Sequence, residues 1–157
     1  MSDFGLAVEK TLKHEGGYNV IEGDQGGETN FGISKRSYPN VDIKHLTKAQ
    51  ASEIYKRDFW NKSGADKITN QKIAESLFDA AVNMGVSRAS KLAKAAAKVP
   101  ICDGVIGKDS ALSINLMNQE DFLTKFTLEK IKFYAAICNK DKSQSKFLLG
   151  WINRSLS

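Results

Sequence analysis

Hydrophobic positions recur along most of this chain with the spacing of amphipathic helices. They predict seven helices, which cover residues 4–15, 47–60, 70–84, 87–98, 109–117, 119–138 and 144–155. Three of the predicted starts carry capping residues: Ser2 or Asp3, Thr47 with Gln50 in a capping box, and Asn70. Glycine or proline follows several of the predicted ends.

The first predicted helix ends on a glutamate that continues its apolar face. That face is formed by Phe4, Ala7, Val8, Thr11 and Leu12. Glu15 lies four positions after Thr11 and three after Leu12, and two glycines then stop the helix. Partial burial and the negative end of the helix dipole both disfavour a charged carboxylate there. Glu15 is therefore not placed like an ordinary surface glutamate.

Residues 18–33 lack the helical period and predict a small β element. Tyr18 and Val20 alternate with polar residues, EGDQGG has the composition of a turn, and TNFGI runs back. We expect a small irregular hairpin or sheet here. The predicted fold class is α+β, mainly α, with a helical C-terminal lobe. A length of 157 residues fits one domain, which can bury roughly 68–70% of its unfolded surface.

The overall composition is that of a globular chain and narrows the range of partners. Hydrophobic residues make up 41% and charged residues 26%. No segment approaches the ~20 apolar residues of a membrane span, so we expect no stable membrane insertion. The net charge of +5 favours a polyanionic partner such as nucleic acid, an anionic membrane or a cell wall. The basic residues are dispersed, however, and a solvated surface accounts for them without such a partner.

Cysteine and histidine usage predicts neither a disulfide framework nor a metal site. Cys102 and Cys138 are expected to be buried thiols, with a single bridge as the alternative. His14 and His45 are isolated, which argues against zinc, and neighbouring helical residues face apart, so His14 is expected at the surface away from Glu15. No cofactor and no metal are expected. The N-terminal residues lack signal-peptide features, so synthesis in the cytosol is expected.

The stretch HEGGYNVIEGDQGGETNFGIS carries the candidate chemistry. A glycosidase needs a protonated carboxylic acid for the leaving oxygen and a second polar group that activates water or stabilises the cationic sugar. Glu15 suits the first role, and Asp24, in a glycine-rich loop, suits the second. Thr29 could help to hold a water molecule. Two alternatives stay open: a glycine-capped helix with a polar turn, and a cation site formed by Glu22, Asp24 and Glu28.

Other polar and aromatic side chains are candidates for binding the substrate. Asp79 and Asn83 share one helix face and are expected either to line a cleft or to anchor the glycine-rich loop. Tyr18 follows the glutamate closely and is expected to contact the substrate. Trp60 could stack on a sugar ring or pack in the core.

The apolar segment FLLGWINR near the C-terminus also has two interpretations. Core packing of Trp151 is the first. The second is an amphipathic, membrane-disrupting tail flanked by Lys146 and Arg154.

A series of motifs occurs in a fixed order along the chain: HEGGY, DQGGETNFGIS, YKRDFW, LFDAAVNMG, DGVIG and GWINR. Together they resemble the N-acetylmuramidases of glycoside hydrolase family 108, whose pattern is E-G-G-Y followed by D-x-G-G-x-T-x-x-G-I. The likeness spans nearly the whole chain. The order of Glu15, Asp24 and Thr29 is also similar to that of phage-type lysozymes, which implies a lysozyme-like fold.

This resemblance implies a hydrolase that cleaves the β-1,4 bond between N-acetylmuramic acid and N-acetylglucosamine in a peptidoglycan glycan strand. Glu15 matches the family's proposed general acid. Asp24 and Thr29 take the second role through the likeness to phage lysozymes, and inversion is expected. Within one domain, residues 1–90 would be the catalytic part and 91–157 a helical part resembling a predicted peptidoglycan-binding region.

We expect a monomer that reaches the cell wall, in the periplasm or outside the cell, through a holin or a secretion system. The main alternative is a non-catalytic wall-binding or secretion-associated protein on the same scaffold. A protein without activity would be free to lose Glu15, which this chain retains. A nucleic-acid binder is a third hypothesis, and net charge is its only support.

Overall fold

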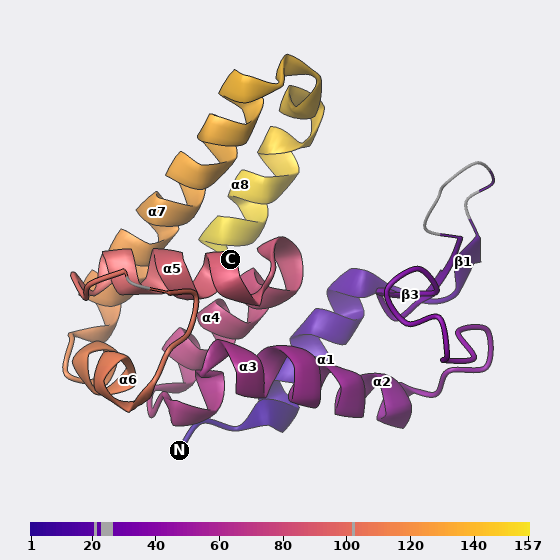
Figure 1. Cartoon of the computed structure of the whole chain (residues 1–157), viewed down its shortest axis with the longest axis horizontal. Helices are drawn as coiled ribbons and strands as arrows, with labels where there is room; N and C mark the ends of the chain where they lie inside the picture. The colour runs from indigo at the N-terminus through magenta and orange to yellow at the C-terminus, as the bar shows by residue number, and fades with distance from the viewer. Residues whose placement is uncertain (21, 23–26, 102) are drawn as a thin grey trace.

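The computed structural model describes residues 1–20, 22, 27–101 and 103–157. Its helices surround α4, with a three-stranded sheet on one side and a two-helix arm on the other (Figure 1). The helices are α1 (Phe4–Glu15), α2 (Lys48–Tyr55), α3 (Asn61–Ser63), α4 (Gln71–Met84), α5 (Val86–Ala96), α6 (Lys108–Asn115), α7 (Gln119–Lys140) and α8 (Leu148–Leu156). The strands are β1 (Asn19–Val20), β2 (Glu28–Asn30) and β3 (Ile33–Ser34). The predicted class, α+β and mainly α, is confirmed.

Helix α1 begins and ends where the sequence predicts. Of the two candidate caps, Asp3 is the one used: its carboxylate accepts hydrogen bonds from the backbone N–H groups of Gly5 at 2.7 Å and Leu6 at 3.4 Å. The helix ends at Glu15, and Gly16 follows with φ of 74°, a conformation that favours glycine. Its buried residues are Ala7, Val8, Thr11 and Leu12.

The sheet is antiparallel throughout, with β2 between β1 and β3. Phe31 and Gly32 connect β2 to β3 with φ values of 51° and 76°. Two consecutive positive φ values are the pattern of a two-residue type I′ turn. The hydroxyl of Tyr55 donates a hydrogen bond to the carbonyl oxygen of Phe31 at 2.7 Å, which ties this turn to α2. The predicted β element is confirmed, but TNFGI forms two strands instead of one. The sequence did not predict the turn between them, because Phe-Gly is not a usual signal for a type I′ turn.

An aromatic cluster around Phe78 of α4 joins the N-terminal helices. The ring of Trp60 lies edge-on to those of Phe4 and Phe78, with centroids 5.6 Å apart in each pair. Tyr55 meets Phe78 at 6.2 Å. Trp60 belongs to a π-helical turn (Lys56–Trp60) that links α2 to α3. Edge-to-face pairs add roughly 0.5–1.5 kcal/mol each to the burial of the rings, so this cluster fixes α1 and α2 against α4.

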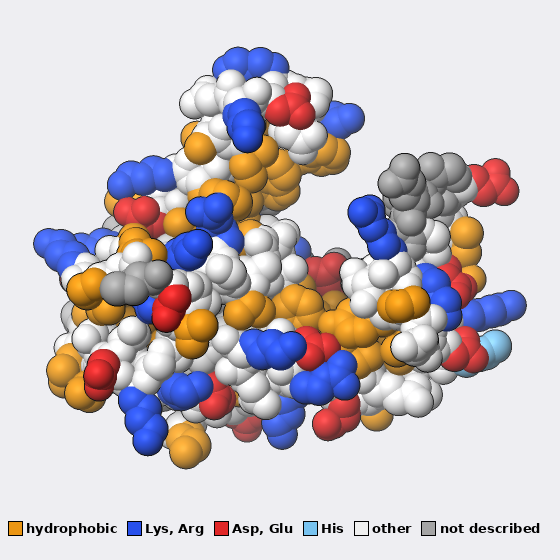
Figure 2. All heavy atoms as spheres, in the orientation of Figure 1, with side chains coloured by type: hydrophobic (Ala, Val, Ile, Leu, Met, Phe, Trp, Pro, Cys, Tyr) orange, Lys and Arg blue, Asp and Glu red, His pale blue; other side chains and the backbone are white. Residues whose placement is uncertain are grey.

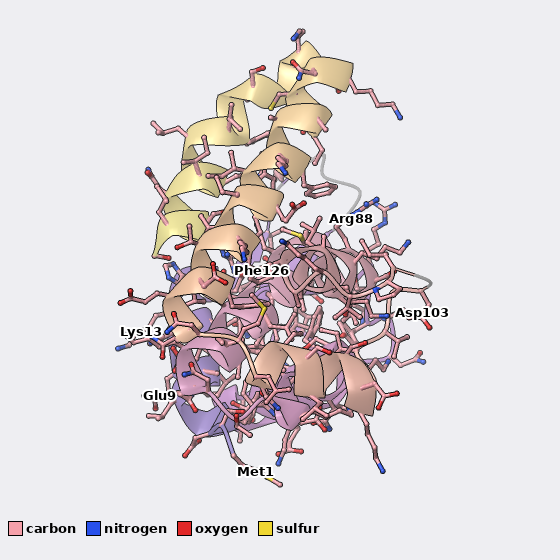
Figure 3. All side chains as sticks on the ribbon, turned by 90° about the vertical axis from the view of Figure 1, so that its left-hand side faces the viewer. Met1, Glu9, Lys13, Arg88, Asp103 and Phe126 are labelled. Carbon is pink, nitrogen blue, oxygen red and sulfur yellow. The ribbon has the colours of Figure 1, made fainter. Side chains whose placement is uncertain are left out.

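Helices α7 and α8 form an arm that rises from the helical body (Figure 3). Phe126, labelled there, is fully buried at the base of the arm. Higher up, Trp151 of α8 stacks on Tyr134 of α7, with centroids 5.0 Å apart and an interplanar angle of 21°. Trp151 therefore packs between helices. The predicted helix 144–155 is divided in the structure, since a 3₁₀ segment (Lys142–Phe147) precedes α8.

One hydrophobic core runs from Ala7 in α1 to Phe126 in α7, so it is shared by the parts predicted as 1–90 and 91–157. Cys138 is buried, with 6% of its surface exposed. The bridge considered between Cys138 and Cys102 falls outside the described residues. Within the described part of the chain, no helix combines the length and apolar character needed to cross a membrane.

Candidate active site

Glu15 lies where the sheet and the arm approach each other. Its side chain is 24% exposed. The sheet contributes Gly32, which lies against the Cβ and Cγ atoms of Glu15, and the arm contributes Arg154, which pairs with its carboxylate. Figure 2 shows an open hollow between the arm and the sheet. A partly exposed carboxyl group held by packing on one side is suited to exchange a proton with a bound molecule.

The guanidinium of Arg154 binds two carboxylates at once. Its Nη2 donates to Glu15 Oε1 at 3.1 Å and to Asp79 Oδ1 at 3.0 Å. Its Nε donates to the two carboxylate oxygens of Asp79 at 3.2 and 3.1 Å. The three residues come from α1, α4 and α8, so only the folded chain brings them together. With both carboxylates ionised, the group has one negative charge in excess.

The charge of Arg154 is fixed by these partners. Burial opposes the charge, but the hydrogen bonds and charge of Asp79, with the charge of Glu15, outweigh it and raise the pKa of the Arg154 guanidinium. Arg154 therefore remains a cation. Asp79 makes three contacts with it and Glu15 makes one. The Asp79 carboxylate is therefore the better neutralised of the two.

Asn83 connects this network to the arm by a second route. Its Oδ1 accepts a hydrogen bond from Arg154 Nη1 at 3.4 Å, and its Nδ2 donates to the hydroxyl of Tyr134. Burial raises the pKa of Tyr134, so its hydroxyl remains protonated. The sequence predicts that Asp79 and Asn83 line a cleft or anchor the glycine-rich loop. In the structure they hold Arg154 of α8.

Gly32 allows the β2–β3 turn to reach Glu15. A Cβ atom at this position would lie 2.6 Å from the Tyr55 hydroxyl oxygen and 2.8 Å and 2.9 Å from Cβ and Cγ of Glu15. Real Cβ atoms do not come so close to other atoms. Burial, with the nearby charge of Glu15, raises the pKa of Tyr55, whose hydroxyl therefore stays a donor to the turn. The glycine before isoleucine in the DQGGETNFGI motif thus has a packing reason.

We expect Gly32→Ala to lower the free energy of unfolding by about 2–4 kcal/mol, because a positive φ costs about 1 kcal/mol and the overlap with Tyr55 and Glu15 adds about 1–3. Displacement of Glu15 should also slow any reaction at this site. Chemical denaturation measures the first effect. Gly17→Ala is the matched control, since a Cβ there meets open space. Equal stability of the two variants would contradict this account of the turn.

Thr29 and Tyr18, two further predicted residues of the glycine-rich stretch, lie on or beside the sheet. Thr29 is the middle residue of β2, partly buried and paired with both neighbouring strands. Tyr18 is 44% exposed, and its hydroxyl donates to Glu28 at 2.9 Å, so its ring is held at the sheet surface. The role predicted for Asp24 falls outside the described residues, as does the cation site that would include it.

Trp60 lies in the core and His14 at the surface, so neither has the position that a role at the active site would need. Trp60 is 3% exposed and enclosed by the aromatic cluster, so its ring offers no face to a sugar. His14 is exposed. Among the residues whose positions are described, no three His, Cys, Asp or Glu side chains gather as metal ligands.

Arg154 is the residue of this site that the sequence pattern did not reveal. The sequence suggested that it flanks an amphipathic tail, whereas its side chain is 20% exposed and points to Asp79 and Glu15. One signal was available: Arg154 lies three positions after Trp151, on the same face of an apolar helix. A charged residue on a packed face needs a partner, and the two carboxylates supply it.

The mainly helical fold with its small antiparallel sheet places this chain in the lysozyme-like class, and Glu15 lies at the end of α1 beside that sheet. Residues 8–85 match the family model described as Glycosyl hydrolase 108, and residues 95–156 match the one described as Predicted Peptidoglycan domain. The chain belongs to the glycosyl hydrolase 108 family.

A solved structure, that of Brucella abortus SagA, is similar in fold. The superposition has a TM-score of 0.74 with 24% sequence identity and covers 98% of this chain and 93% of that one. The lysozyme-like fold predicted from the motifs is confirmed. No curated protein sequence matches this chain significantly.

Proposed function

We propose that this protein is an N-acetylmuramidase that cleaves the β-1,4 bond between N-acetylmuramic acid and N-acetylglucosamine in peptidoglycan, with Glu15 as the general acid. The placement of Glu15 carries the proposal. It combines partial exposure with a single contact to a cation that is shared with Asp79. The family and the match to a predicted peptidoglycan domain support the choice of substrate.

The Arg154 network holds the Glu15 carboxyl group in place. Arg154 donates one hydrogen bond to Glu15, and the same guanidinium is itself fixed by three contacts with Asp79. Protonated Glu15 then donates to the glycosidic oxygen as the bond breaks. Asp79 and Arg154 are positioning residues in this scheme.

The second role belongs to Asp24 and Thr29. Asp24 would deprotonate water or stabilise the oxocarbenium-like transition state, and its assignment rests on sequence. Thr29 would orient the water, and its place on β2 beside the Gly32 turn favours this role. If the carboxyl groups of Glu15 and Asp24 lie about 6.5–9.5 Å apart, water fits between them and the product has inverted configuration.

Tyr18 and Asn83 would contact the glycan. The exposed ring of Tyr18 can lie against a sugar, and the net charge of +5 favours approach to an anionic wall. The proposal includes a monomer that reaches the wall through a holin or a secretion system.

The test is mass spectrometry of the fragments that the protein releases from purified sacculi, after reduction of their new ends. A muramidase leaves reduced N-acetylmuramic acid, and this is the expected product. Reduced N-acetylglucosamine would instead identify a glucosaminidase. Retention on sacculi without any release of reducing ends would support the non-catalytic wall-binding alternative.

A further inference from the structure

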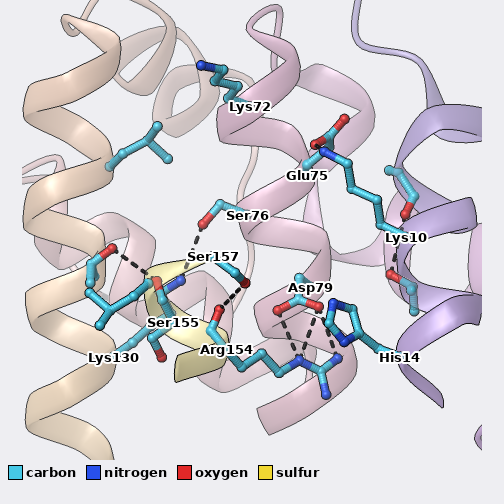
Figure 4. Close-up of a pocket in the computed structure, with 15 residues that line it drawn as sticks. Lys10, His14, Lys72, Glu75, Ser76, Asp79, Lys130, Arg154, Ser155 and Ser157 are labelled. Carbon is cyan, nitrogen blue, oxygen red and sulfur yellow. Dashed lines mark hydrogen bonds and ion pairs between the residues drawn. The ribbon is translucent and has the colours of Figure 1, made fainter. Parts of the chain in front are cut away.

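A cavity of about 410 Å³ lies on the other side of the Asp79–Arg154 pair. Residues of α1, α4, α7 and α8 line it, and Figure 4 shows their side chains. The cations among them are Lys10, Lys72, Lys130 and Arg154, and the acids are Glu75 and Asp79. Glu15 is not among the described residues that line this cavity. The cavity is therefore distinct from the surface where Glu15 would meet a glycan.

Two of the four cations are already neutralised by neighbours. Lys10 pairs with Glu75, and Arg154 pairs with Asp79 and Glu15. Lys72 and Lys130 have no carboxylate within ion-pair distance in the described part of the chain. The cavity therefore has unneutralised positive charge on the walls formed by α4 and α7.

Lys130 is the more unusual of these two lysines because it is buried. Only 5% of its surface is exposed, and its Nζ donates one long hydrogen bond, 3.3 Å, to Ser76 Oγ. The ammonium also lies 4.8 Å from the ring centroid of Phe126. An ammonium has three N–H donors, and among the described residues only Ser76 accepts one. Burial lowers the pKa of Lys130, while the charge of Asp79 opposes this.

A buried cation with unused donors is costly unless an acceptor reaches it. Water can supply one, but water does not neutralise the charge. An oxyanion can do both, because several of its oxygens accept hydrogen bonds at once. Lys130 is a buried residue of the cavity lining and Lys72 an exposed one, so the cavity offers such a ligand one inner and one outer lysine.

We propose that this cavity binds a small oxyanion, a phosphate or a carboxylate, through the ammonium groups of Lys130 and Lys72. The site is separate from the glycan-cleaving site and shares with it only the Asp79–Arg154 pair. Its existence does not depend on the reaction that Glu15 catalyses.

Titration calorimetry with inorganic phosphate, at constant pH and ionic strength, tests the proposal. We expect saturable binding to the wild type. Lys130→Met should weaken it by about tenfold or more, the loss that follows removal of one charge-assisted hydrogen bond. Lys72→Met, on the exposed rim, should weaken it by a smaller factor. Lys132→Met is the matched control on the same helix, because Lys132 is 72% exposed and outside the cavity, and it should bind like the wild type.

Thermal unfolding gives a second readout. Phosphate should raise the Tm of the wild type and of Lys132→Met by mass action, and should raise that of Lys130→Met by much less. If Lys130→Met does not fold, the test is whether Lys72→Met binds phosphate more weakly than Lys132→Met. The same measurements are repeated with acetate. Acetate binding that also depends on Lys130 would support the site and show that it accepts carboxylates as well. Absence of saturable binding of either anion to the wild type, or equal binding by all variants, would overturn the proposal.

Discussion

Glu15→Gln is expected to lower the rate of sacculus digestion by about 10²–10⁴-fold, the usual contribution of general acid catalysis. Glutamine has the shape of glutamate and can still accept the hydrogen bond from Arg154, but it cannot donate a proton to a glycosidic oxygen. The measurement is the release of soluble reducing ends from purified sacculi. The unfolding transition should stay close to that of the wild type, because the packing of Gly32 against Cβ and Cγ is retained.

Glu9→Gln is the control for this experiment. Glu9 lies on the same helix, is 64% exposed and, among the residues with described positions, makes a single long ion pair, 3.8 Å, with Lys48. Its substitution should leave the rate unchanged. Digestion by Glu15→Gln at the rate of Glu9→Gln would show that Glu15 is not the acid.

Arg154→Met is expected to reduce both stability and activity. It leaves the partly buried carboxylates of Glu15 and Asp79 facing each other without a cation, which should cost on the order of 3 kcal/mol of unfolding free energy. The activity should fall as well, because neither carboxylate is then held in place. Denaturation and sacculus digestion, each compared with Arg36→Met, measure the two effects. Arg36 is exposed on the turn after β3, so its loss should change little.

A double-mutant cycle separates the charge effect from a general loss of packing. Asp79→Asn removes one of the two carboxylates, so in the Arg154→Met background it should restore part of the lost stability. In the wild-type background the same substitution should destabilise, because Asp79 then no longer pairs with the guanidinium. If Asp79→Asn destabilises both backgrounds equally, the two residues are not coupled, and Asp79 does not position Arg154 as proposed.

The network also bears on how the two parts of the chain cooperate. The match to the glycosyl hydrolase model ends at residue 85, and Arg154 lies in the segment that matches a predicted peptidoglycan domain. Arg154 nevertheless completes the environment of Glu15, and the hydrophobic core is continuous between the parts. We therefore expect a fragment of residues 1–90 to lack the ion pair that holds the Glu15 carboxylate in place.

Much of the fold was accessible from local patterns. The capping residues Asp3, Thr47 and Asn70 begin helices as predicted, since each satisfies backbone N–H groups in its own helix. The division of TNFGI into β2 and β3 was not predicted. The turn between them places Phe31 at a positive φ, and the hydroxyl of Tyr55, 24 positions along the chain, holds it there. A contact so distant leaves no trace in the local sequence.

The sequence by itself determined that α1 ends on a glutamate of its apolar face, and that glycines follow. Both facts depend on helical period and backbone sterics, which act over a few residues. Only the tertiary structure decided which charge stands beside that glutamate. Arg154 lies 139 positions from Glu15, and the sequence placed it only as a residue that flanks an apolar segment. The packing of α8 against α7 directs Arg154 to Asp79 of α4 and to Glu15, because a cation on a packed helix face is stable only where an acid meets it.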